Sequence, residues 1–258
     1  MKRREQATAA AVGLIAAGYN VAVNRVLSPK THVPANLAFA AAACGIGRAA
    51  ARMSWSDLGF GRTEVGRGFR VGGKSSLVSA ALVAAAAAAP GTRRFFADER
   101  ILRSSRGAAV YEVCVRIPLA TALPEEVIFR GVLLSVLSRS HTTGTAIAWT
   151  STLFGLWHVL PTLDTMRTNP IKDVLPEGRL GYAAAAGAAI PATAATGALF
   201  ALLRNRSGSV VAPVLTHTAI NATAYIGGRL SRSPPPRPAH PRGMMSPRST
   251  PRTVGVGD

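Results

Sequence analysis

The chain has 258 residues, of which 48% are hydrophobic and only 16% are charged, whereas soluble domains carry about a quarter charged residues. Its net charge is +18, and the basic residues lie between long apolar segments and in the C-terminal tail. This arrangement favours contact with anionic lipid. It argues against a nucleic-acid partner, because no binding module and no basic stripe on a folded face are recognisable.

Seven segments are apolar enough to predict membrane spans, which need about 20 residues each. In chain order they are Ala7–Leu27, Pro34–Ala51, Ser75–Ala89, Gly107–Leu137, Thr142–Leu160, Leu180–Leu203 and Val210–Ile226. The fold class that we predict is all-α, a polytopic membrane helical bundle of about seven spans. We divide it into N-terminal spans with basic interfacial loops (1–106), a membrane core (107–227) and a disordered tail rich in Pro and Arg (228–258).

Two basic stretches interrupt the N-terminal spans. Met53–Lys74 is expected at the membrane interface, with Trp55 and Phe60 as aromatic anchors. Arg93–Arg106 is expected as a basic amphipathic helix on the membrane surface. Both stretches therefore indicate contact with lipid headgroups.

A P-loop-like pattern and the two cysteines do not indicate a nucleotide-binding, disulfide or metal site. Gly68–Ser75 fits the P-loop pattern GxxxxGK[ST], but no buried strand precedes it and no Mg²⁺-binding Asp follows another strand, as nucleotide binding requires. We interpret it as a flexible basic loop and expect no nucleotide. Cys44 and Cys114 lie far apart in apolar surroundings, and we expect both to be small buried side chains.

Ionisable residues in apolar segments are candidates for function, because each costs about 2.5–3.5 kcal/mol at the centre of a membrane helix. Glu126 and Arg130 are four residues apart and can pair on one helix face. Glu125 points about 100° away, and a desolvated carboxylate without that partner suits a general base. The alternative is that both glutamates serve a structural ion-pair network. We expect Arg116 to pair with Glu112 in a structural role.

Two histidines lie in later apolar segments. His158 follows Phe154 by one helical turn, and histidine suits acid–base chemistry near neutral pH. His217 and Asn221 share one helix face, where their donors could hold an oxyanion. Each has a structural alternative, namely a hydrogen-bonded core histidine for His158 and a contact between helices for His217 and Asn221.

Together these residues form three motifs in order: EExxxR, FxxxH and HxxxN. They are Glu125, Glu126 and Arg130, then Phe154 and His158, then His217 and Asn221. This motif set resembles that of the CPBP family of intramembrane endopeptidases, which includes the CAAX prenyl endopeptidases. The resemblance covers roughly residues 107–226, and three motifs in order are far more specific than one.

The resemblance implies a bundle of membrane helices that encloses a catalytic cavity. It implies that Glu125 and His158 activate a water molecule and that His217 and Asn221 stabilise the oxyanion. Glu126, Arg130 and Phe154 would support them. No cofactor is expected; if the reaction depends on a divalent metal, Glu125, His158 and His217 are the ligands that we would name.

We therefore predict a multi-pass integral membrane protein, in the plasma membrane of a bacterium, that hydrolyses a peptide bond. The substrate would be a membrane-associated peptide or protein of CAAX-like, signal or bacteriocin type. One alternative is a non-catalytic bacteriocin-immunity or scaffold protein on the same fold. Another is a small transporter that uses the buried Glu and His as a proton relay.

Overall fold

The computed structural model of the chain describes residues 2–231, and this part of the chain is helical without any strand. The all-α prediction is therefore confirmed. The elements are α1 (Lys2–Arg25), η1 (Pro29–Thr31), α2 (His32–Ala50), α3 (Arg62–Ala88), η2 (Arg93–Phe96), α4 (Glu99–Leu102), α5 (Arg106–Tyr111), η3 (Glu112–Ala122), α6 (Leu123–Glu126), η4 (Val127–Leu133), α7 (Leu134–Ser138), α8 (Thr143–Trp157), α9 (Val159–Thr165), η5 (Pro170–Val174), α10 (Gly178–Ser207) and α11 (Val211–Leu230).

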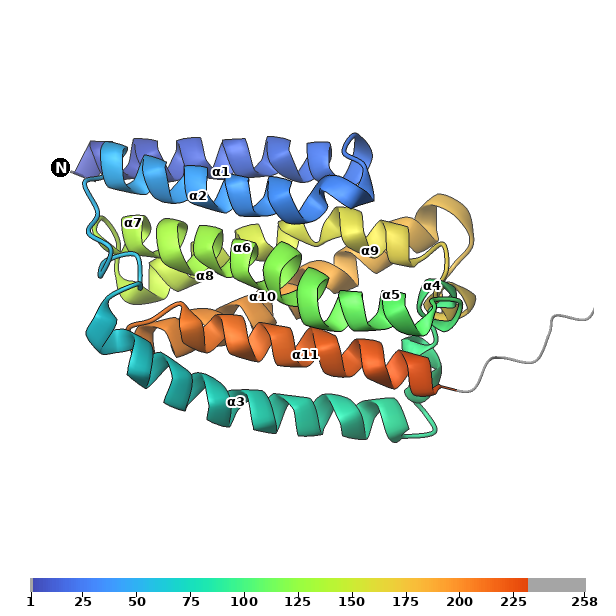
Figure 1. Cartoon of the computed structure of the whole chain (residues 1–258). Helices are drawn as coiled ribbons and strands as arrows, with labels where there is room; N and C mark the ends of the chain where they lie inside the picture. The colour runs from blue at the N-terminus through green and yellow to red at the C-terminus, as the bar shows by residue number, and fades with distance from the viewer. Residues whose placement is uncertain (1, 232–258) are drawn as a thin grey trace, which may run out of the picture.

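The longer helices run side by side as a bundle (Figure 1). A continuous helical rod, residues 106–138, runs through its middle from α5 to α7. The paired helices α1 and α2 lie on one side of this rod, and α3 packs against α11 on the other. The hydrophobic core includes Phe129, Phe154 and Phe200, each almost completely buried. The rod therefore contributes to the centre of the molecule and is shielded by the other helices.

Four helices of the described residues are long and apolar enough to cross a membrane. They are Arg3–Arg25, Pro29–Ala50, Arg62–Ala88 and Gly178–Ser207. The protein is thus an integral membrane protein, but the expected count of seven spans is not confirmed. The remaining three predicted segments are 107–137, 142–160 and 210–226. They contain the buried charges and the histidines or are divided into several helices, so their helices are shorter or less apolar than those four.

The third span begins earlier than predicted. Helix α3 starts at Arg62, so the interpretation of residues 68–75 as a flexible loop is wrong, and only residues 51–61 separate α2 from α3. A Cβ added at Gly68 would approach Ser209 to 2.9 Å, and one at Gly72 would approach Ala212 to 2.9 Å. These glycines allow α3 to pack closely against α11, as small residues do between membrane helices.

The basic stretch after α3 is not one amphipathic helix. It is divided into η2 and α4, because Asp98 adopts an extended backbone and caps α4 by accepting a hydrogen bond from the backbone N–H of Arg100. Asp98 also accepts a hydrogen bond from Thr168 at 3.0 Å. Burial raises the pKa of Asp98, but the hydrogen bonds and charge of Arg100 outweigh it and lower the pKa below its ordinary value. This stretch therefore docks on the connection that follows α9.

Three smaller expectations concern particular residues. Cys44 is buried as predicted, whereas Cys114 is exposed on η3, so the prediction for Cys114 is wrong. The ion pair between Arg116 and Glu112 is confirmed. Helix α11 continues to Leu230, three residues into the predicted tail, and the rest of that tail (232–258) lies outside the described residues.

Candidate functional site

Glu125 and Glu126 lie on α6, a four-residue helical segment between two π-helical segments, η3 and η4. Pro118 and Pro124 lie in this part of the rod and remove two backbone N–H donors. Wider π-type turns place side chains differently from an α-helix and are frequent at functional sites. Both carboxylates are buried, Glu126 completely. The helix is therefore irregular where it carries its two buried acids.

Glu126 is the centre of a buried ion-pair network. Its Oε1 accepts hydrogen bonds from Nη1 of Arg130 at 3.1 Å and from Nδ1 of His217 at 2.9 Å. The side chains of Glu126 and Arg130 are both 0% exposed, so solvent does not screen their attraction. The predicted pairing of Glu126 with Arg130 is confirmed, and the network joins η4 to α11.

The guanidinium of Arg130 is held by oxygen atoms and aromatic rings. Its Nη2 donates to the carbonyl of Gly197 at 2.9 Å, and its central carbon lies 4.1 Å from the ring centroid of Phe154. A Cβ at position 197 would come within 2.9 Å of this Nη2. Cation–π contact stabilises a desolvated arginine, so the ring of Phe154 stabilises the buried charge of Arg130.

Glu125 has a different environment. Its Oε1 accepts a hydrogen bond from the indole Nε1 of Trp157 at 3.1 Å, while its Oε2 is buried without a hydrogen-bond partner in the described structure. The nearest basic nitrogen to Oε2 is Nε2 of His158 at 3.9 Å. This separation is too long for a direct hydrogen bond and suits one bridging water molecule.

His158 sits at the break between α8 and α9. Its backbone N–H bonds to the carbonyls of Gly155 and Leu156, which leaves the carbonyl of Phe154 free to accept from Nδ1 of the His158 ring at 2.8 Å. A carbonyl can only accept, so Nδ1 carries the proton and Nε2 of the neutral ring presents its lone pair. The helix break therefore determines the tautomer of His158.

His217 lies on α11, close to the same group of aromatic residues. Its ring stacks on Phe200 with centroids 5.0 Å apart, and its Nδ1–H is used by Glu126. Asn221 follows one turn later on α11 and is half-buried, and its side chain makes no hydrogen bond to another described residue. The structure thus joins His217 to the Glu126 network, while it places Asn221 only by its position on the helix.

Two contributors to the site are not apparent from the motifs. Trp157 precedes His158 directly and binds Glu125, and Gly197 supplies a carbonyl to Arg130. A signal for Trp157 does exist, because a buried indole N–H requires an acceptor and acidic acceptors are scarce in these apolar segments. No comparable signal marks Gly197, because a backbone carbonyl has no sequence pattern.

A three-ligand metal site is not preformed in the described part of the chain. Within residues 2–231, no group of three or more His, Cys, Asp or Glu side chains is arranged to hold a metal ion. Nδ1 of His158 and Nδ1 of His217 each donate to an oxygen, which leaves Nε2 of both rings free in the described structure, and different glutamates face the two rings. The expectation that no cofactor is needed stays a prediction.

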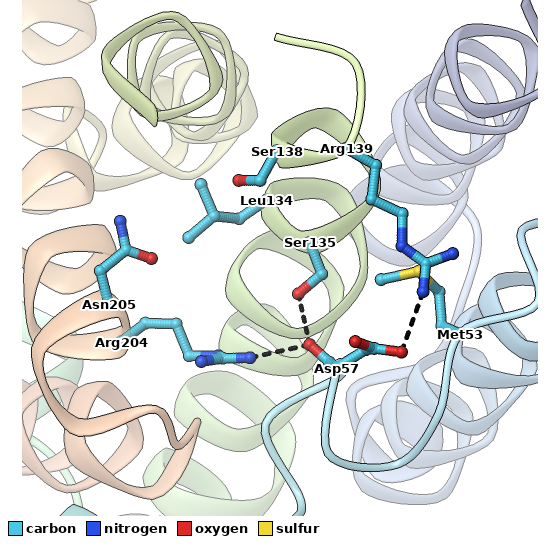
Figure 2. Close-up of a pocket in the computed structure, with 8 residues that line it drawn as sticks. All are labelled: Met53, Asp57, Leu134, Ser135, Ser138, Arg139, Arg204 and Asn205. Carbon is cyan, nitrogen blue, oxygen red and sulfur yellow. Dashed lines mark hydrogen bonds and ion pairs between the residues drawn. The ribbon is translucent and has the colours of Figure 1, made fainter. Parts of the chain in front are cut away.

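A separate hollow of about 260 Å³ opens where the connection between α2 and α3 meets α7 and α10 (Figure 2). Ser135 and Arg204 both donate to the carbonyl of Asp57, and Arg139 pairs with its carboxylate at 2.9 Å. Burial raises the pKa of Asp57, but hydrogen bonds from Ser54 and Arg139 lower it overall. None of the residues that line this hollow belongs to the three motifs, so it is not the site of the two glutamates.

Comparison with known proteins bears on the rod and the helices around it. No curated protein and no solved structure gives a significant match to the chain. A family model described as type II CAAX prenyl endopeptidase Rce1-like matches residues 108–223, the range that holds all three motifs. Residues 108–223 are therefore similar to Rce1-like type II CAAX prenyl endopeptidases, which supports the resemblance to the CPBP family, and this similarity points to a membrane protease of the CAAX type.

Proposed function

We propose that the chain is a glutamic-type intramembrane endopeptidase that uses Glu125 and His158 to activate water. One observation carries this proposal. Oε2 of Glu125 and Nε2 of His158 face each other at 3.9 Å, and the carboxylate oxygen is buried without a hydrogen-bond partner. Two acceptors at this distance are arranged to take both protons of one water molecule, which makes the water oxygen nucleophilic.

Fixed hydrogen bonds on the far sides of the two groups support their role as a base. The indole of Trp157 orients Glu125 through Oε1, and the carbonyl of Phe154 holds His158 in the Nδ1–H tautomer. A base that is oriented in advance loses little entropy when the reaction begins. Attack of the water oxygen on the peptide carbon would transfer one water proton to the Glu125–His158 pair.

We further propose that His217 and Asn221 stabilise the oxyanion that forms on the peptide carbonyl. Nδ1 of His217 donates to the carboxylate of Glu126 at 2.9 Å, and a ring with both nitrogens protonated would present its Nε2–H as a donor to the oxyanion. The side-chain amide of Asn221, one turn further, is a second donor. Preorganised donors of this kind typically contribute about 10²–10³-fold each to the rate.

The proton balance of the proposed reaction closes within this set of residues. When the tetrahedral intermediate collapses, its C–N bond breaks and the leaving amine takes the proton held by Glu125 or His158. The oxyanion becomes the carboxyl group of the new C-terminus, and Glu125 returns to its ionised form. The step needs no oxidant, reductant or metal ion.

The proposed substrate is the peptide segment of a membrane-associated protein, of CAAX-like, signal or bacteriocin type. The family supports a peptide substrate in the membrane. The helices that are long and apolar enough to span a bilayer support a multi-pass arrangement, for which we propose the plasma membrane of a bacterium. Lipid-embedded residues around the site would exclude bulk water from the reaction.

The test is cleavage of a quenched fluorescent peptide library by the purified protein in detergent. The library contains prenylated and unmodified peptides, and the wild type is compared with Glu125→Gln, each with and without a metal chelator. We expect cleavage by the wild type in both conditions and none by Glu125→Gln. Loss of wild-type cleavage on chelation would contradict the metal-free mechanism. Absence of cleavage by folded wild type, across both peptide classes, would favour the immunity or scaffold role.

A further inference from the structure

Two prolines interrupt the backbone hydrogen bonds next to the proposed site. In an α-helix, the carbonyl of residue i accepts the N–H of residue i+4, and proline has no N–H. Pro161 therefore leaves the carbonyl of Trp157 without its helical donor. Pro124 removes an N–H directly after the π-type turns of η3, in which the carbonyl of Ala120 lies. A buried carbonyl without a partner is unfavourable, so a donor from another helix stabilises the backbone at both places.

In each case the donor is an asparagine from the N-terminal helix pair. Nδ2 of Asn20 on α1 donates to the carbonyl of Trp157 at 2.9 Å, and Nδ2 of Asn36 on α2 donates to the carbonyl of Ala120 at 2.6 Å. Asn20 is buried, and the contacts span 137 and 84 residues of sequence. Neither asparagine belongs to residues 108–223, which match the family.

Both amides are themselves held in orientation. The hydroxyl of Tyr19 donates to Oδ1 of Asn36 at 2.6 Å, and Nδ2 of Asn24 donates to Oδ1 of Asn20 at 2.6 Å. An amide whose oxygen is occupied by a donor must present its N–H₂ group to the other partner. The assignment of each Asn as donor to a carbonyl is therefore consistent on both sides.

The two carbonyls lie on the segments that carry the groups facing each other in the site. Trp157 precedes His158, and its indole binds Glu125, so its backbone position affects both groups. The carbonyl of Ala120 is five residues before Glu125 on the same rod. A second contact, the ion pair of Arg25 with Asp164 at 2.8 Å, holds the end of α1 to α9 beyond the His158 break.

We propose that Asn20 and Asn36 are positioning residues of the site: their side-chain amides donate to backbone carbonyls where Pro161 and Pro124 interrupt the helical hydrogen bonding, and so hold the segments that carry His158 and Glu125. The inference rests on the proposed function for its kinetic consequence, but the structural coupling can be measured without it. Helices α1 and α2 then complete the site rather than only anchoring the chain in lipid.

The test uses Asn20→Leu and Asn36→Leu in the full-length protein, since Leu is close to Asn in shape and has no donor. The control variants are Leu14→Ala on α1 and Ala38→Leu on α2, both at exposed positions. A displacement of about 1 Å at a catalytic group can lower a rate about a hundredfold. We expect kcat of peptide cleavage to fall about 10–100-fold in both Asn variants, with KM within about twofold of the controls.

A second readout does not depend on cleavage. Nitrogen-15 NMR of histidine-labelled protein in detergent reports which ring nitrogen of His158 carries the proton, with the signal assigned by its loss in His158→Gln. Over the pH range in which the ring is neutral, we expect the Nδ1–H tautomer in the wild type and in Asn36→Leu, and a mixture of tautomers in Asn20→Leu. The double variant Asn20→Leu/Pro161→Ala restores a backbone N–H to the carbonyl of Trp157 and should recover the wild-type signal.

The outcomes separate the two proposals. An unchanged His158 tautomer in Asn20→Leu would overturn the positioning role of Asn20, even if the wild type cleaved no peptide. If the wild type is active, wild-type kcat in Asn36→Leu would overturn the role of Asn36. If kcat and KM both worsened by the same factor, and did so equally in the exposed control variants, the effect would be one of general packing and the inference would be overturned. The charged groups that face the Glu125–His158 pair, namely Glu126, Arg130 and His217, are unchanged in every variant.

Discussion

Two adjacent glutamates on one short helix each face a histidine from another helix, and Oε2 of each is buried without a hydrogen-bond partner among the described residues, yet the two pairs differ in spacing, partners and exposure. Glu126 is completely buried and shares one oxygen between Arg130 and His217 at distances of 3.1 and 2.9 Å. Glu125 and His158 lie 3.9 Å apart, and 22% of the His158 side chain remains exposed. One pair is a closed ion-pair network, and the other is an open pair of acceptors.

This difference shows how one sequence motif can serve two purposes. Closing a buried ion pair requires that each charge has partners on several sides, and Arg130 meets this requirement with Phe154, Phe200 and the carbonyl of Gly197. The second pair stays open because each group is oriented by a hydrogen bond on the side away from its partner, as Trp157 orients Glu125. We therefore expect substitutions in the closed network to affect stability and those in the open pair to affect rate.

The largest expected effect is on catalysis by the open pair. Glu125→Gln keeps the acceptor for Trp157 but removes the base, and general-base catalysis typically contributes about 10²–10⁴-fold. We expect kcat of peptide cleavage to fall by this factor while the unfolding transition in detergent stays unchanged. A variant that unfolded at lower temperature than the wild type would place Glu125 in the structural network instead and remove the contrast between the pairs.

Stability should depend most on the closed network. Arg130→Leu leaves Glu126 without its strongest partner, and breaking a buried ion pair in this way costs about 3–5 kcal/mol. The control is Arg139→Leu, since Arg139 is part-exposed in its pair with Asp57 and exposed pairs contribute about 0–1 kcal/mol. Reversible unfolding in mixed micelles measures both. Similar decreases in the free energy of unfolding in the two variants would show that the burial of Arg130 does not make its ion pair more stabilising.

A smaller effect is expected at the group that holds Glu125 from behind. Trp157→Phe keeps an aromatic ring near Phe129 but removes the N–H that binds the carboxylate, which we expect to lower kcat about tenfold, the equivalent of about 1.4 kcal/mol. Trp149→Phe, at an exposed position on α8, should leave kcat unchanged.

The smallest expected effect lies far from both pairs. The pKa of Asp98 is lowered in the folded protein, because the hydrogen bonds and charge of Arg100 outweigh its burial. A lowered folded-state pKa contributes stability above the unfolded value of about 3.9, and this contribution is lost as pH falls through the folded value. Asp98→Asn should therefore unfold at a lower temperature near pH 7, with the difference disappearing below about pH 4. A difference independent of pH would instead indicate the loss of the cap alone.

Part of the site is predictable because its signals are local. Glu126 and Arg130 can be paired from their i,i+4 spacing alone, and the structure confirms the pair. The motif order also leads to the family that residues 108–223 match. The start of α3 is not predictable in this way, because Gly68 and Gly72 normally weaken a helix and are favourable here only through close packing against α11. The number of spans is also not predictable from apolar length, because the central rod carries charged residues that are buried by other helices.

By itself the sequence determined the all-α class, the membrane location and the residues at which chemistry is expected, because apolar length and the spacing of charges are local properties. Only the tertiary structure decided which glutamate meets which histidine, since those contacts join residues 33 and 91 positions apart in sequence. It also decided that Asn20 and Asn36 donate to backbone carbonyls near Pro161 and Pro124. A missing backbone donor is visible in the sequence, but its replacement depends on which helix packs beside it.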